Sequence, residues 1–311
     1  MDFKKERVDL HNQWPKKKMF KAEEQFRNLI DTKNQASIFF PADIPYSTGA
    51  EYQIFVGHFV DGLEALPFRP DYFFDHCFRV IDCGAKPIFP NKGIKGIVQG
   101  LGVKFNASDP NEWATISQQL TALMPLSSYR YVAKRIYQAH FGSDPQSSQI
   151  SGRASDFFGP SRYAQFLAKF VTPFPLTASG EVPYENLQKV TNFLKLYISG
   201  NLATKAKPAT HLKLDMSDKA NIPSSAKRIE FLLSLFLFIS RNERAHGNML
   251  SPFRTSKATL DRYEGFYFAT LSAYIFALGV IQLRNIGGPA IAEIVNCCAL
   301  NAAIQVKLFG R

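Results

Sequence analysis

Cysteine is scarce in this chain, with four residues among 311. Two of them, Cys297 and Cys298, are neighbours, and a bond between adjacent cysteines is strained, so we expect no disulfide framework with Cys77 and Cys83. The sequence also lacks a Cys-x-x-Cys pair and a cluster of histidines, and it therefore indicates no zinc site. Free thiols are typical of a reducing compartment, and we expect a cytoplasmic protein.

Other common signatures are missing as well. The first residues, Met1-Asp2-Phe3-Lys4-Lys5, lack the apolar stretch of a signal peptide. There is no Gly-x-x-x-x-Gly-Lys loop for nucleotide binding, and neither Ser155 nor Ser161 has the Gly-x-Ser-x-Gly context of a hydrolase. No internal repeat is visible. These absences argue against a secreted protein, a nucleotide-driven enzyme and a serine hydrolase.

One apolar stretch, residues 265–283, is nearly long enough to span a bilayer. It contains Thr270, Ser272 and Gln282, and the segments around it are soluble in character. We interpret it as a buried core helix and expect no membrane association.

Positive charge is abundant. The formal net charge is +11, from 37 lysines and arginines against 26 acidic residues. Such a surplus favours a polyanionic partner, and nucleic acid is the first candidate. Much of it lies near the N-terminus, in Lys4, Lys5, Arg7, Lys16, Lys17, Lys18 and Lys21. The 28 phenylalanines indicate a core rich in aromatic packing.

Apolar periodicity predicts an all-α fold. Helices are expected over residues 16–29, 51–65, 70–81, 111–124, 129–141, 161–170 and 184–198. Between two of them, residues 85–110 are rich in proline and glycine, and we expect an irregular or strand-like insertion around residues 97–98 and 103–105. We expect linkers at residues 142–160 and 203–225. The division that follows is an N-terminal helical region, 1–150, and a helical-bundle domain, 151–311.

The last third has the clearest pattern. Ser224 or Ser225 is expected to cap a helix that continues through an apolar run to residue 239 and ends near Gly247. A second long helix covers residues 260–283, and a terminal helix runs through residue 308. Apolar residues all round the first two predict burial at the centre of a bundle.

The apolar run leads into Arg241-Asn242-Glu243-Arg244-Ala245-His246-Gly247. This segment resembles the Arg-polar-x-x-x-His motif of the HEPN superfamily, all-helical domains of which many are metal-independent RNases. The resemblance covers residues 160–311 and includes the long helix that follows the motif. It implies an endoribonuclease that needs no cofactor, with Arg241, Asn242 and His246 as catalytic residues. It also implies a role in a toxin–antitoxin or anti-phage defence system.

The chemistry of these side chains suits RNA cleavage by the 2′-OH. Histidine titrates near neutral pH and can take the hydroxyl proton. The arginine guanidinium can donate two hydrogen bonds to the phosphate oxygens, on which negative charge develops. On an ideal helix Arg241 and His246 point about 140° apart, so the site requires the helix to end by His246 or a partner chain to complete it. The resemblance implies a homodimer in which two copies of the motif face one cleft, and it leaves room for an antitoxin or sensor protein as a further partner.

Further basic residues are candidates for holding RNA phosphates beside this cleft. They are Lys227, Arg228, Arg244, Arg254 and Lys257. A second match to the bare spacing, Arg135 with His140, has apolar Ile136 in place of the polar neighbour, and a second site there stays open. The alternative function is a non-catalytic HEPN-like module that binds RNA or protein.

Overall fold

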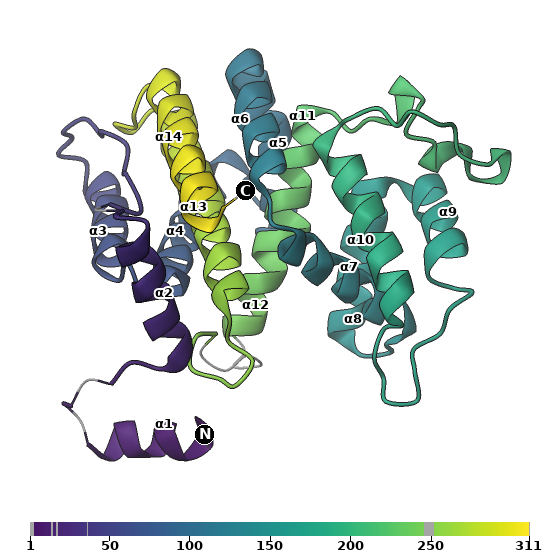
Figure 1. Ribbon diagram of the computed structural model, residues 1–311. Helices are drawn as coiled ribbons and strands as arrows, with labels where there is room; N and C mark the ends of the chain where they lie inside the picture. The colour runs from purple at the N-terminus through teal and green to yellow at the C-terminus, as the bar shows by residue number, and fades with distance from the viewer. Residues whose placement is uncertain (1–2, 14, 17, 36, 246–251, 311) are drawn as a thin grey trace. The chain divides into compact units, whose positions relative to one another are not determined.

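The computed structural model describes residues 3–13, 15–16, 18–35, 37–245 and 252–310. The described residues contain 14 α-helices and no strand, so the all-α prediction is confirmed. They form two compact units (Figure 1). The first unit combines residues 1–90 with residues 240–311, and the second consists of residues 91–239. This division differs from the expected one at residue 150 because both ends of the chain contribute to the first unit.

The described part of the first unit is built from six α-helices and one short 3-10 turn, η1 (Lys86–Ile88). The helices are α1 (Phe3–Asn12), α2 (Lys21–Thr32), α3 (Ala50–Glu64), α4 (Pro70–Gly84), α13 (Leu260–Leu283) and α14 (Ile291–Phe309). The chain passes from the second unit to the first within α12 (Phe238–Ala245). Proline opens α4, where its missing N–H costs nothing because the first helical turn has no partner for it.

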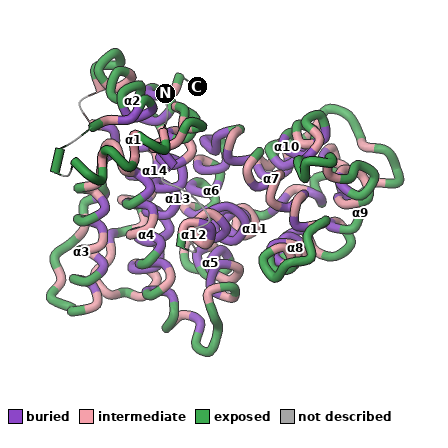
Figure 2. Tube along the Cα trace, turned by 90° about the horizontal axis from the view of Figure 1, so that it is seen from below, coloured by how far each residue is buried: buried purple, intermediate pink, exposed green. Residues whose placement is uncertain are grey.

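Helix α13 forms the core of the first unit. It packs against α4 and α14 and is buried along most of its length (Figure 2). Its tyrosines combine ring packing with hydrogen bonding: Tyr263 stacks on Phe26 with ring centroids 4.0 Å apart, and the Tyr267 hydroxyl donates to the carbonyl of Pro67 at 2.7 Å. Thr270 donates to the carbonyl of Pro70 at 2.8 Å. These bonds attach the start of α4 to the core.

Helices α3 and α4 approach each other closely because α3 has a glycine at the contact. A Cβ atom at Gly62 would collide with the ring of Phe73 on α4. Phe73 itself is fully buried. Any larger residue at position 62 therefore forces the two helices apart.

The second unit contains the remaining helices. They are α5 (Ile94–Ser108), α6 (Pro110–Leu123), α7 (Leu126–Phe141), α8 (Pro145–Phe158), α9 (Pro160–Phe170), α10 (Tyr184–Ser199) and α11 (Ser225–Glu230), with 3-10 turns η2 (Ala209–Leu214) and η3 (Lys219–Asn221) and a π-helical segment over Phe231–Leu237. The expected cap is confirmed, because the Ser224 hydroxyl accepts from the Lys227 N–H.

Two expectations for this unit are wrong. An irregular or strand-like insertion is expected around residues 97–98 and 103–105, but both segments lie within helix α5. Glycine in α5 serves close packing, since a Cβ at Gly102 would collide with the carbonyl of Ala226 on α11. The expected linker over residues 142–160 contains α8, whose start is capped when the Asp144 carboxylate accepts from the Ser147 N–H.

Among the residues that the structure describes, two helices are long and apolar enough to cross a membrane, α13 and α14. The apolar window of α13 is 89% buried, which is what the core helix of a folded unit requires, whereas that of α14 is 39% buried. Length and composition are weak evidence for a membrane span in either helix.

Candidate functional site

The predicted motif lies on α12 at its C-terminal end. Arg241, Asn242 and Arg244 are part of the helix, and Ala245 is its last residue. His246 and Gly247 lie outside the described residues, so the expected helix stop at Gly247 stays a prediction. Arg241 and Arg244 are three residues apart and share a helix face.

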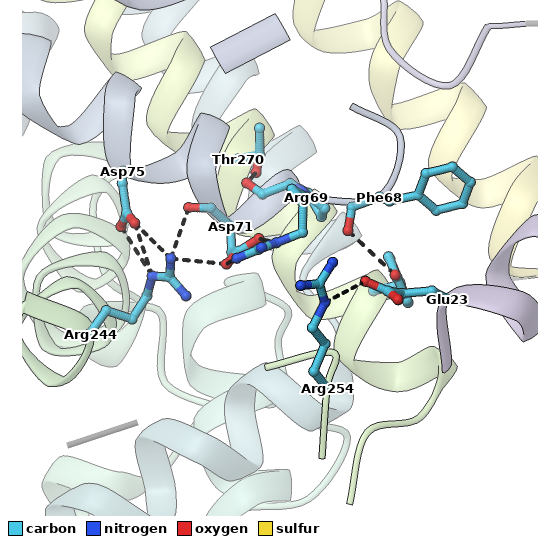
Figure 3. Close-up of polar contacts among 10 residues, drawn as sticks. Glu23, Phe68, Arg69, Asp71, Asp75, Arg244, Arg254 and Thr270 are labelled. Carbon is cyan, nitrogen blue, oxygen red and sulfur yellow. Dashed lines mark hydrogen bonds and ion pairs between the residues drawn. The ribbon is translucent and has the colours of Figure 1, made fainter. Parts of the chain in front are cut away.

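Arg244 is held by two carboxylates from α4 (Figure 3). Its Nη2 lies 2.7 Å from one carboxylate oxygen of Asp75 and 3.0 Å from Asp71, and its Nε lies 3.1 Å from the other oxygen of Asp75. The Arg244 side chain is only 12% exposed. Burial by itself lowers the pKa of Arg244, but the hydrogen bonds and charges of Asp75 and Asp71 outweigh burial and raise it. Because its Nε and Nη2 donors are engaged by α4, Arg244 is suited to anchoring α12 on α4.

A second arginine completes this network. Arg69 donates from Nε and Nη2 to the two oxygens of Asp71 at 2.9 and 2.8 Å, as drawn in Figure 3. The Asp71 side chain is fully buried, so it depends on both arginines to compensate its charge. A buried carboxylate with two guanidinium partners makes a rigid junction between α12 and the start of α4.

Arg241 has a more open environment. Its side chain is 35% exposed, and its Nη2 lies 3.9 Å from Asp82, near the limit for an ion pair. The guanidinium also lies 5.9 Å from the ring centre of Phe78, and its Nη1 donates to the Asn242 side-chain oxygen at 3.3 Å. A half-exposed guanidinium with one distant carboxylate keeps donors for a further anion.

The α4 residues that hold these arginines form one stripe, which we call the α4 acidic stripe. It consists of Asp71, Asp75, Phe78 and Asp82, spaced four, three and four residues apart along one helix face. The sequence patterns considered above do not predict this stripe, in which Asp75 accepts a hydrogen bond from Arg244. The spacing of the carboxylates was visible in the sequence. The partner of Asp71 and Asp75 is Arg244, which is 173 and 169 residues away in the sequence, and this pairing was not visible.

The other predicted phosphate-binding residues occupy different positions. In the first unit Arg254 donates from Nε to the buried Glu23 at 3.0 Å (Figure 3), and Lys257 is exposed. Lys227 and Arg228 belong to the second unit. Lys227 pairs with Glu230 at 2.7 Å, and burial lowers the pKa of the half-buried Arg228.

The second match to the motif spacing lies inside helix α7 of the second unit. Arg135 donates to the side chain of its neighbour Gln138 at 3.2 Å, and the His140 Nε2 lies 3.3 Å from the Thr172 hydroxyl. Both side chains are half-buried and contact neighbouring side chains, as expected for structural residues of a helix.

The fold and site define an all-α protein with a basic helix end held on an acidic stripe. No protein-family model, curated protein or solved structure matches this chain.

Proposed function

We propose that the chain is a HEPN-type endoribonuclease that cleaves RNA without metal, through Arg241, Asn242 and His246. The observation that carries the proposal is the contrast between the two arginines on α12. Arg244 is closed in by Asp71 and Asp75, whereas Arg241 is 35% exposed, beside Asn242. Arg244 thereby holds α12 in place, while the guanidinium of Arg241 stays accessible near the end of the helix. A net charge of +11 is consistent with an RNA substrate.

The reaction needs three tasks from these residues. His246 removes the proton from a 2′-OH, and the resulting alkoxide attacks the adjacent phosphorus. Arg241 stabilises the negative charge that gathers on the phosphate oxygens. Asn242 accepts a hydrogen bond from Arg241 and so orients the guanidinium. The 5′-oxygen leaves with a proton, and the other fragment ends in a 2′,3′-cyclic phosphate.

Each motif contains one histidine, His246, which can act as the base or as the acid but not as both at once. We propose that two protomers pair so that two copies of His246 face one cleft, one removing the 2′-OH proton and the other protonating the leaving oxygen. The toxin or anti-phage role, a restraining antitoxin or sensor partner, and a cytoplasmic location belong to the same proposal. The defence role and the partner rest on the resemblance of the motif to the superfamily, whereas the location rests on the few free cysteines and the absence of a signal-peptide pattern.

The direct test is RNA cleavage by the purified full chain in EDTA, compared with His246→Ala and Arg241→Ala. We expect products ending in 2′,3′-cyclic phosphate from the wild type and a loss of at least about 100-fold in each variant. The matched control is His140→Ala, which removes the histidine of the second spacing match and is expected to cleave like the wild type. Cleavage that survives in His246→Ala contradicts the proposed site.

The rival function is a non-catalytic HEPN-like helical module that binds RNA or protein. It is favoured if the wild type binds RNA tightly and leaves it intact while Arg241→Ala weakens binding. Binding and cleavage are therefore measured on the same labelled RNA, by electrophoretic shift and by product analysis.

A further inference from the structure

Two histidines that are 18 positions apart in the sequence face each other between α3 and α4. The Nδ1 atoms of His58 and His76 lie 3.2 Å apart. Their ring centroids are 5.3 Å apart and the ring planes are inclined by 59°, so the rings meet at their nitrogen edges and do not stack. Asp61, one turn after His58 on α3, brings a carboxylate oxygen to the same place.

From this geometry we propose that His58, Asp61 and His76 bind one divalent transition-metal ion, with zinc as the best fit. The three ligand atoms lie within 4.8 Å of one another. Two nitrogens bound to one tetrahedral zinc at about 2.0–2.1 Å are about 3.3 Å apart, close to the separation of the two Nδ1 atoms. The imidazoles therefore need almost no movement. The carboxylate of the exposed Asp61 supplies the third ligand.

The two helices that carry the site are closely packed beside it. Gly62 follows Asp61 directly, and its lack of a side chain lets α3 and α4 pack closely at Phe73. Phe73 is one turn before His76. The metal ligands thus come from two helices whose spacing is fixed by a buried contact, which reduces the cost of organising the site.

The charges around the cluster are mixed. Arg79 acts electrostatically on His58 and opposes a cation, whereas Asp61 favours one. Arg79 is exposed, so it can extend into water when the ion binds. Both histidines are half-buried, so each is partly accessible to solvent. Two imidazoles and one carboxylate are three protein ligands, which leaves a fourth position for water.

This site is distinct from the proposed nuclease site. His76 is next to Asp75 in sequence but points toward α3, whereas Asp75 holds Arg244 of α12. The inference does not rest on RNA cleavage, because metal binding is measured by titration. A chain that binds zinc and also cleaves RNA in EDTA satisfies both proposals, and failure of one leaves the other intact.

The test titrates the full chain, without an affinity tag, with zinc chloride by calorimetry. We expect one zinc per chain, with affinity reduced at least tenfold in His58→Ala, His76→Ala and Asp61→Asn. His11→Ala, which removes an exposed histidine of α1, is the matched control and is expected to bind like the wild type. Cobalt(II) is expected to show the visible absorption of a tetrahedral ion.

A second measurement uses the wild type alone and so does not depend on how the variants fold. Diethyl pyrocarbonate acylates free imidazole nitrogens, and mass spectrometry locates the modified residues. Zinc is expected to protect His58 and His76 and to leave His11 reactive. The proposal is overturned if the wild type binds no zinc, if the three variants bind it as tightly as the wild type, or if zinc protects neither histidine.

Discussion

Arg241 and Arg244 lie one turn apart on α12, yet the side chain of Arg241 is 35% exposed and that of Arg244 only 12%. The difference comes from α4. Arg244 reaches Asp71 and Asp75 near the start of that helix, whereas Arg241 lies 3.9 Å from Asp82 near its end. Arg244 is therefore suited to stabilising the fold and Arg241 to binding an anion. We expect substitution of Arg244 to lower stability and substitution of Arg241 to lower RNA cleavage.

Removing Arg244 is expected to destabilise the protein strongly. Arg244→Ala leaves the fully buried Asp71 with one arginine fewer and deprives Asp75 of its partner. Loss of one member of a buried ion pair costs about 3–5 kcal/mol of unfolding free energy. Urea unfolding measures the loss. The exposed Arg262→Ala is the control and is expected to stay within about 0.5 kcal/mol of the wild type.

Removing Arg241 is expected to change the stability of the protein little and to reduce RNA cleavage strongly. Its contact with Asp82 is long and partly exposed, so Arg241→Ala is expected to cost about 1 kcal/mol or less. Cleavage of RNA is expected to fall by about 100-fold or more. Arg241→Lys keeps the charge but loses the two-donor fork, and we expect it to recover only part of the activity. Equal loss of stability in the Arg241 and Arg244 variants contradicts the division of tasks.

Mixed dimers test whether one cleft needs two copies of His246. If it does, an equal mixture of wild-type and His246→Ala chains, allowed to exchange subunits, retains about a quarter of the activity. Independent sites on each chain retain about half. The measurement is cleavage rate against the fraction of wild-type chains. A straight-line dependence rules out the shared cleft, and sedimentation or light scattering on the same samples reports the oligomeric state.

Two glycines of α3 are expected to respond in opposite ways to the same substitution. Gly62→Ala places a methyl group against the ring of Phe73, and such overpacking costs about 1–3 kcal/mol. A Cβ at Gly57 meets nothing within 4 Å, so Gly57→Ala is expected to stabilise the helix by up to about 1 kcal/mol. Thermal unfolding of the two variants compares them directly. Similar shifts in both would mean that α3 and α4 do not pack closely at Gly62.

Glu230 is expected to make the stability of the chain depend on pH. Burial raises the pKa of its carboxyl, and the hydrogen bond and charge of Lys227 oppose the rise only in part. The stability linked to a raised pKa is fully present below the unfolded pKa and is lost as pH rises through the folded pKa. Glu230→Gln is therefore expected to be more stabilising at pH 7 than at pH 4.

Urea unfolding at the two pH values checks this expectation. Glu185→Gln changes an exposed glutamate of the same unit and is the matched control, expected to show no comparable growth of its effect with pH. A Glu230→Gln variant that is destabilised more at pH 7 than at pH 4 would mean that the pair with Lys227 outweighs burial.

Local patterns in the sequence were sufficient to predict most helices. The start of α4 at Pro70, the Ser224 cap and the full length of α13 from Leu260 to Leu283 agree with the structure. These features depend on residues within one or two helical turns. The start of α8 also depends on neighbouring residues. Asp144 followed by Pro145 is a helix-start signal that the sequence analysis does not use.

Helix α5 shows where local patterns mislead. Its glycines favour a loop or strands when they are considered alone, yet Gly102 is in a helix because α11 packs against it at Ala226. The low helix propensity of glycine is offset by close packing, which only the folded unit provides.

The sequence by itself determined the helical class, the buried character of α13 and the position of Arg241 and Arg244 on a helix. Only the tertiary structure decided that Arg244 meets Asp71 and Asp75, and that His58 meets His76. The physical reason is the distance along the chain over which each interaction acts. Helix periodicity arises from hydrogen bonds four residues apart, whereas the partner of a side chain is chosen by which helix faces pack together.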